Sequence, residues 1–133
     1  MSFPLSGSGR RVDWAPFAAA AALALIAGQS HAQDAKRGQS IFNANCAICH
    51  SVSPGANIVG PSLHGVVGRK AGTLKGYDYS KALRASGVEW TPANLNTWLT
   101  SPRAFIPMNR MSFSGLHTPS ERADVIAYLA KQK

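Results

Sequence analysis

The sequence predicts an all-α domain in which helices near its two ends enclose long connecting loops. No segment alternates apolar and polar residues convincingly, as a half-buried strand does. Helix-start signals stand at Thr91-Pro92 and Thr118-Pro119, where a capping hydroxyl precedes a proline at the first helical position. Two prolines and six glycines fall between residues 51 and 79, a density of helix breakers that indicates loop.

The first half of the domain is predicted to be one helix followed by loop. Residues 36–46 contain the apolar pair Ile41 and Phe42 and end at the cysteines, which favours a short helix. The loop over residues 51–79 is too long for a simple connection in a compact domain. We therefore expect it to wrap around something.

The second half is predicted to contain three helices. A short one spans residues 80–85, and a second opens at Thr91-Pro92 and runs to about Leu99. Residues 101–115, with two prolines, are predicted to be loop. Residues 118–121 read Thr-Pro-Ser-Glu, a capping box, and the apolar residues Val125, Ile126 and Leu129 follow at helical spacing.

Residues 1–32 have the pattern of an export signal. Arg10 and Arg11 supply a basic start, residues 14–28 are apolar and uncharged, and Ser30 and Ala32 are small residues suited to a signal peptidase. We expect cleavage after Ala32, which places the mature domain at residues 33–133 in the periplasm.

Two alternatives exist for this segment. An uncleaved membrane anchor needs roughly 20 apolar residues, and residues 14–28 fall short of that length and contain Pro16. The Arg10-Arg11 pair also suggests twin-arginine export, although Val12-Asp13 matches that signal poorly.

Composition excludes several classes of protein. The 133 residues include 14 Lys+Arg, 6 Asp+Glu and 2 Cys, for a formal net charge of +8. Two cysteines are too few for a disulfide framework or a four-cysteine zinc site. With charged residues at 15% and hydrophobic residues at 45%, a packed core is expected rather than a disordered polyelectrolyte. Removing residues 1–32 leaves 101 residues with 12 Lys+Arg and 5 Asp+Glu, or +7.

The chemistry-bearing motif is Cys46-Ala47-Ile48-Cys49-His50. Two thiols separated by two residues can reach the two vinyl groups of a haem, and the adjacent imidazole can reach its iron. This C-x-x-C-H pattern is typical of c-type haem attachment. It predicts one covalent haem c, bound through Cys46 and Cys49.

Other interpretations of this motif each lack a component. A thioredoxin-like site needs a strand–helix–strand context, and no strands are predicted. A zinc site needs further ligands, and only scattered histidines remain. A disulfide across two residues would be strained and would leave His50 without a role.

A haem electron carrier needs a second axial ligand on its iron. Besides His50, the mature chain offers His64, His117, Met108 and Met111. A thioether raises the reduction potential relative to two histidines. Both methionines lie in the 101–115 loop, far from His50 along the chain, and spacing alone does not separate them.

From about residue 36 to residue 131 the chain resembles the class I cytochromes c, of the soluble mitochondrial and bacterial c2 type. The resemblance rests on stretches in matching order and spacing: 60–65 (GPSLHG), 68–69 (GR), 76–80 (GYDYS), Trp90, 105–107 (FIP), 111–116 (MSFSGL) and 122–129 (RADVIAYL). It implies the class I cytochrome c fold, with N- and C-terminal helices packed together and long loops wrapping one covalent haem.

The resemblance also implies residue roles around the haem. His50 and Met111 would be the iron ligands, and the Pro61 carbonyl would accept the second ring proton of His50. Tyr79 and Trp90 would hydrogen-bond the haem propionates, and Arg69 would offset their charge. Asn109 would stand in the loop before the ligand, and Phe113 would lie beside the exposed haem edge.

Two further implications concern the helices and the departures from the family. Gly38 and Phe42 would pack against Val125 and Tyr128. Residues 108–110 (Met-Asn-Arg) replace the more usual Gly-Thr-Lys, so a side chain stands where the family often has glycine. Leu83 occupies a position where many relatives have a polar residue that holds an internal water, which predicts a drier pocket with a perturbed reduction potential.

The main functional prediction is a soluble periplasmic one-electron carrier rather than an enzyme, because the chain supplies no catalytic constellation and the haem carries the chemistry. By resemblance it would shuttle electrons from a cytochrome bc complex to a terminal oxidase or photosynthetic reaction centre, as a monomer without membrane insertion after cleavage. A basic face would steer it to acidic docking faces on those complexes. Its members would be Lys70, Lys75, Lys81, Arg103 and Arg110.

Two other functions compete with this prediction. A haem c protein with a labile Met111 could act as a peroxidase or bind gases. A nucleic-acid binder is suggested by charge alone, and the mature domain lacks the basic and aromatic platform that such binding uses.

Overall fold

Within residues 33–133 the chain forms five helices joined by loops, and this computed structural model describes that range together with residue 9. The predicted signal segment, residues 1–32, lies outside the described residues apart from Gly9. Two isolated β-bridges, His50 with Asn57 and Lys70 with Glu89, are the only β-type pairings in the described part of the chain. The prediction of an all-α fold is confirmed.

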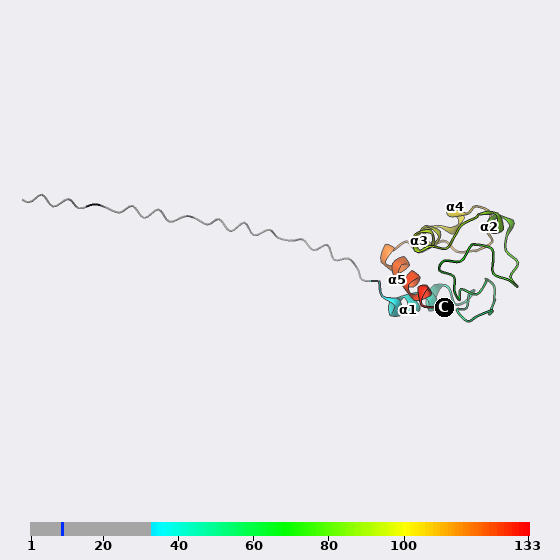
Figure 1. Cartoon of the computed structure of the whole chain (residues 1–133), viewed down its shortest axis with the longest axis horizontal. Coiled ribbons are helices and arrows are strands. Elements are labelled where there is room, and N and C mark those ends of the chain that lie inside the picture. The colour runs from blue at the N-terminus through cyan, green and yellow to red at the C-terminus, as the bar shows by residue number, and fades with distance from the viewer. Residues whose placement is uncertain (1–8, 10–32) are drawn as a thin grey trace, which may run out of the picture.

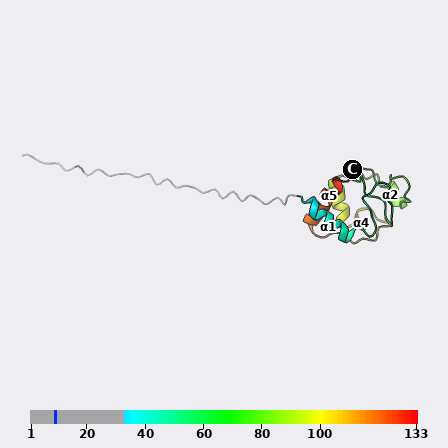
Figure 2. The ribbon, with the colours of Figure 1, turned by 90° about the horizontal axis from the view of Figure 1, so that it is seen from below.

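The two terminal helices, α1 (Ala35–Asn45) and α5 (Pro119–Ala130), pack side by side in both views (Figure 1, Figure 2). Gly38 allows this close approach, because a Cβ built at Gly38 would lie 2.0 Å from the carbonyl oxygen of Asp124. The rings of Phe42 and Tyr128 meet with their centroids 5.5 Å apart, and Val125 is buried. The predicted helix pairing is present.

Polar contacts fix the start of α1. The Asp34 side chain accepts hydrogen bonds from the backbone N–H groups of Lys36 and Arg37, at 2.9 and 3.1 Å. The Asp34 N–H donates to Oδ1 of the buried Asp124 at 2.8 Å, and Arg37 pairs with the other oxygen of Asp124 at 3.4 Å. These bonds hold the beginning of the domain against α5.

The remaining helices lie across the molecule from α1 (Figure 1). The short helix α2 (Lys81–Ala85) is capped by the Ser80 hydroxyl, and α3 (Pro92–Thr100) by the Thr91 hydroxyl, which accepts from the Asn94 N–H at 3.1 Å. Helix α4 (Pro102–Phe105) is a single turn. The starts of α2 and α3 follow the sequence prediction closely.

Two predictions of local structure are wrong. Residues 102–105 form the turn α4 instead of loop, because Pro102 is preset for the first helical position and the N–H groups of Phe105 and Ile106 bond the carbonyls of Ser101 and Pro102. The capping box of α5 does not form, since the Thr118 hydroxyl accepts no capping hydrogen bond. The buried Arg122 holds this helix start instead, donating to the carbonyls of Leu116 and His117.

The hydrophobic core joins α1, α3 and α5 to the loop that follows α1. Its buried members are mostly aliphatic and aromatic: Ile41, Phe42, Val66, Ala71, Trp90, Leu95, Trp98, Leu99, Ile106, Leu116, Val125, Ile126, Tyr128 and Leu129. Cys46, Met111 and Phe113 pack against this core but stay partly exposed. Among the described residues, none of the helices is both long enough and apolar enough to cross a membrane.

Candidate functional site

One cavity of about 280 Å³ opens between the core and the long loops. The wall comes from the end of α1, the loop before Pro61, helices α3 and α5 and residues 109–113. Tyr77, Tyr79, Ser80 and Leu83 also contribute to it. The structure brings all ten predicted site residues to this wall: Cys46, Cys49, His50, Pro61, Arg69, Tyr79, Trp90, Asn109, Met111 and Phe113. Their individual roles toward a haem remain predictions.

The two cysteines lie where α1 turns into loop. Cys46 is the C-cap of α1, and its N–H donates to the carbonyl of Phe42 at 2.7 Å. The N–H groups of Cys49 and His50 both donate to the Cys46 carbonyl, at 3.0 and 2.9 Å, so the motif continues as a tight turn. Burial, with a smaller contribution from Cys49, raises the pKa of Cys46 to about 11.

The imidazole of His50 is held by the loop that ends at Pro61. Its Nδ1 lies 2.8 Å from the Pro61 carbonyl oxygen, so a proton on Nδ1 leaves Nε2 free to bind a metal. Gly60 passes directly over the ring, since a Cβ there would lie 2.2 Å from Cε1 of His50. Burial lowers the pKa of His50, and the hydrogen bond to Pro61 opposes this effect only in part. The lowered pKa favours the neutral imidazole, which is the form that binds a metal.

Asn109 organises the loop that carries Met111. Its side-chain amide donates to the carbonyls of Pro102 and Ile106, at 3.0 and 2.8 Å, and its Oδ1 accepts the Met111 N–H at 2.8 Å. One side chain thus connects α4 to the backbone of the predicted ligand.

The structure separates the candidates for the second axial ligand. Met111 is partly buried and lines the cavity. Met108 is 84% exposed and adopts φ of 67°, a left-handed conformation that suits the glycine often found there. His64 contacts the Val52 carbonyl at 3.2 Å, and neither it nor the exposed His117 lines the cavity. Besides His50, Met111 alone of these candidates reaches the wall.

Arg69, Tyr79 and Trp90 form another part of the wall. Arg69 donates to the carbonyls of His64 and Ser62, at 3.1 and 3.0 Å, so it braces the loop around it. Burial lowers the pKa of Arg69 and raises the pKa of Tyr79. The backbone N–H of Trp90 donates to the Arg69 carbonyl at 2.8 Å, which holds these two residues together. The half-buried Arg69 guanidinium, the Tyr79 hydroxyl and the Trp90 side chain share one region of the wall, which suits anionic propionates.

Sequence reasoning missed two features of the wall. Trp98, on α3, lines the cavity and packs against Trp90 with ring centroids 5.2 Å apart. The helical spacing of Leu95, Trp98 and Leu99 could have indicated that this face of the helix is buried. Tyr77 also lines the cavity, although it stands in a loop where no periodicity marks it.

The five residues of the predicted basic face are all exposed, but they differ in their relation to the cavity. Arg110 lines it, and Arg103 lines an adjoining hollow together with Met111 and Phe113. Lys70, Lys75 and Lys81 line neither, so the structure brings only the two arginines to the rim.

The donor set and the cavity fit a haem. A thiol pair, an imidazole with a fixed tautomer and a thioether share a mainly apolar wall, with Arg69, Tyr79 and Trp90 available for carboxylates. The paired terminal helices and the wrapping loops complete the architecture of a monohaem c-type protein.

Comparison with known proteins identifies the family. The sequence profile described as Cytochrome c matches residues 35–133. Cytochrome c2 of Rhodomicrobium vannielii is 45% identical over 113 residues, covering 84% of this chain and 90% of the relative. Cytochrome c of Trypanosoma brucei brucei is 56% identical over 79 residues, covering 59% of this chain and 85% of the relative. The solved structure of cytochrome cH from Methylobacterium extorquens has a TM-score of 0.69 at 43% identity, covering 73% and 97% of the two chains.

The chain belongs to the cytochrome c family. Members of this family carry covalent haem c and transfer electrons rather than catalyse reactions, so this chain is an electron carrier whose cofactor is haem c. The resemblance and the fold predicted from the sequence are both confirmed.

Proposed function

We propose that the mature chain is a soluble periplasmic one-electron shuttle with a six-coordinate haem c, ligated by His50 and Met111. The observation that supports this most strongly is that Cys46, Cys49, His50 and Met111 all line one cavity. With both axial positions taken, no site is open to a substrate. Haem c supplies an iron that exchanges one electron with a partner.

The chain's own residues support that exchange in three ways. Pro61 fixes the His50 ring, and Asn109 fixes the backbone of Met111. The mainly apolar wall keeps water away, which limits rearrangement when the charge changes. Phe113 lines the cavity from the ligand loop and is partly exposed, so it suits contact with a partner's surface.

Ligation is tested by the near-infrared sulfur-to-iron charge-transfer band of the oxidised holoprotein. We expect the band in the native protein and in Met108→Leu, and its loss in Met111→Leu. A native protein without the band, with peroxide turnover and five-coordinate iron at rest, would favour the competing function of a peroxidase or gas-binding protein.

Export and processing are tested by the intact mass of the purified protein. Cleavage after Ala32 with one attached haem gives one mass, and a retained export segment gives a larger one. A periplasmic location follows from the bacterial c2 relative only by similarity, so fractionation of cells has to accompany the mass measurement.

The proposed partners are a cytochrome bc complex as donor and a terminal oxidase or photosynthetic reaction centre as acceptor. Arg103 and Arg110 stand at the rim, where acidic docking faces would attract them. Electron-transfer rates with such complexes should therefore fall as ionic strength rises. Rates that do not change with salt would contradict steering by charge.

We also propose that the pocket near Leu83 is dry. Leu83 lines the cavity with the buried Trp98, so two apolar side chains stand in the wall. Leu83→Asn should stabilise the oxidised iron and lower the midpoint potential, since a polar group then faces the pocket. Equal midpoints in the two proteins would exclude this effect.

A further inference from the structure

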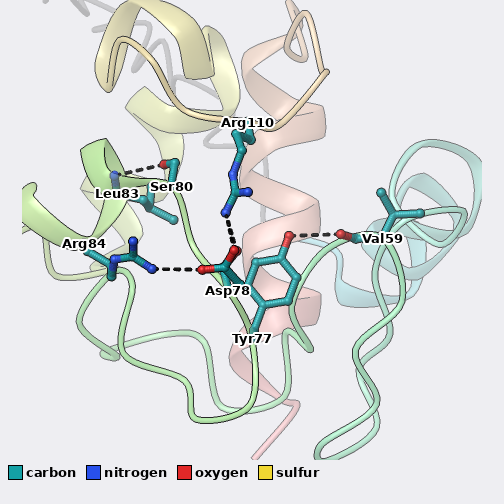
Figure 3. Close-up of polar contacts among 7 residues, drawn as sticks. All are labelled: Val59, Tyr77, Asp78, Ser80, Leu83, Arg84 and Arg110. Carbon is teal, nitrogen blue, oxygen red and sulfur yellow. Dashed lines mark hydrogen bonds and ion pairs between the residues drawn. The ribbon is translucent and has the colours of Figure 1, made fainter.

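The carboxylate of Asp78 lies between two arginines that come from different parts of the chain (Figure 3). Arg84 donates to Oδ1 at 3.0 Å from six residues away. Arg110 approaches Oδ2 at 3.5 Å and also donates to the backbone carbonyl of Asp78, spanning 32 residues. Only the Arg110 contact reaches the loop that carries Met111.

Neighbouring residues tie the same segment to the other side of the site. The Tyr77 hydroxyl donates to the carbonyl of Val59 at 2.9 Å (Figure 3). The Asn57 amide donates to the carbonyl of Gly76 at 3.2 Å. Val59 and Pro61 lie in one loop, and the Pro61 carbonyl holds His50. Residues 76–78 are therefore connected to both loops that bring a predicted iron ligand to the cavity.

The contacts that residues 76–78 make with the two loops differ in their sensitivity to salt. The Tyr77 and Asn57 bonds join neutral groups and do not depend on salt. The Asp78 pair is exposed, with 81% of the Asp78 side chain and 58% of the Arg110 side chain accessible to water. Exposed ion pairs contribute little to overall stability and are screened by salt. Local opening of a loop requires much less free energy than global unfolding, so a small contribution still changes how often the loop opens.

We propose that Asp78 is a positioning residue for Met111, acting as a latch: through Arg110 it holds the Met111 loop against residues 76–78. This inference rests on the proposed ligation of the iron by Met111. When the latch is closed, the thioether stays on the cavity wall. When Arg110 is released, the loop between α4 and Leu116 loses its hydrogen bond and its ion pair to Asp78 and opens more often.

Three variants of the oxidised holoprotein separate the latch from a general effect of charge. Arg110→Gln removes the latch, and Arg84→Gln removes the other partner of Asp78 without touching the Met111 loop. Lys131→Gln removes one positive charge from the C-cap of α5. The measurements are the near-infrared sulfur-to-iron band and the rate at which added imidazole displaces the sixth ligand.

We expect Arg110→Gln to raise the imidazole displacement rate by about threefold, the size of one exposed ion-pair contribution. Arg84→Gln and Lys131→Gln should leave this rate nearly unchanged. Asp78→Asn should also raise the displacement rate, but by less than Arg110→Gln, because the backbone carbonyl of residue 78 still accepts from Arg110. The double variant Asp78→Asn/Arg110→Gln should have nearly the same displacement rate as Arg110→Gln alone, because both changes break the same contact. Salt should accelerate displacement in the native protein and much less in Arg110→Gln.

Two results would overturn the latch in distinguishable ways. Equal displacement rates in Arg110→Gln and Arg84→Gln, with the band present in the native protein, would overturn the latch alone. A native protein without the band would remove Met111 as ligand, and would overturn the proposed ligation together with the latch.

Discussion

The pair of terminal helices and the loops around the cavity are held by different forces. Between α1 and α5 the backbones approach so closely that a Cβ at Gly38 would collide with the Asp124 carbonyl, and Val125 is only 1% exposed. The loops instead depend on individual hydrogen bonds, such as those of Asn109 and of the Pro61 carbonyl. The contrast teaches that packing sets the stability of this domain, whereas a few polar bonds set the position of the iron ligands.

Because of this contrast, a mutation can disrupt one region and leave the other intact. A change in the helix pair should lower the free energy of unfolding and leave the ligand set intact in the molecules that stay folded. A change in the loops should alter ligation at little cost in stability.

Gly38→Ala should be the most damaging change. In an isolated helix alanine is more favourable than glycine, but here the new Cβ would lie 2.5 Å or less from two backbone atoms of Asp124, which cannot yield as a flexible side chain would. We expect a loss of about 3 kcal/mol in the free energy of unfolding of the holoprotein, measured by guanidinium titration.

Gly87→Ala is the matched control. Its Cβ would meet nothing within 4 Å, but φ is 64°, so the substitution costs only about 1 kcal/mol of backbone strain. Equal losses at Gly38 and Gly87 would show that close packing of the helices is not the source of the effect.

Arg122→Leu should cost about 2 kcal/mol. This buried side chain donates to the carbonyls of Leu116 and His117 and to the Asn96 side chain, so it joins α5 to the end of the ligand loop and to α3. Its removal leaves the Leu116 carbonyl without that donor. Arg122→Lys, which keeps the charge, should lose less. Thermal unfolding of the three proteins tests this order, and an unchanged midpoint in Arg122→Leu would refute it.

Asn109→Ala should cost only about 1 kcal/mol of stability but should weaken ligation clearly. It removes both bonds to α4 and the acceptor for the Met111 N–H. We expect a weaker near-infrared band at nearly unchanged helical circular dichroism. The comparison fails if the band keeps its native intensity, since ligation would then not depend on this polar bond.

Met108→Gly should have the smallest effect. Glycine relieves the left-handed strain at φ of 67° but loses more freedom on folding, so we expect a net gain below about 1 kcal/mol. Met108→Ala keeps the strain and should leave stability unchanged, because the side chain is exposed. A large loss in either variant would mean that the thioether has a packing role.

Much of the fold was predictable because its signals are local. The starts of α3 and α5 follow from Thr-Pro pairs, and the end of α1 follows from the position of Cys46. The single turn α4 was not predictable, since four residues show no helical periodicity. The Thr118 cap does not form. The start of α5 is held by Arg122, which donates to two carbonyls that no local pattern identifies.

The site was predictable to a similar extent. The C-x-x-C-H motif identifies three members by spacing alone, but it left Met108 and Met111 equivalent. Resemblance favoured Met111, and the structure adds exposure and backbone conformation as physical reasons. The contact between Asp78 and Arg110 could not be foreseen, because 32 residues and no periodic register separate them.

The most direct test of the central claim follows one oxidised sample through a guanidinium titration with two probes. Helical circular dichroism reports the α1–α5 pair, and the near-infrared sulfur-to-iron band reports the loop that carries Met111. The account predicts that the band disappears at a lower denaturant concentration than the helical signal. Two transitions that coincide would contradict it, because packing and ligation would then form one cooperative unit.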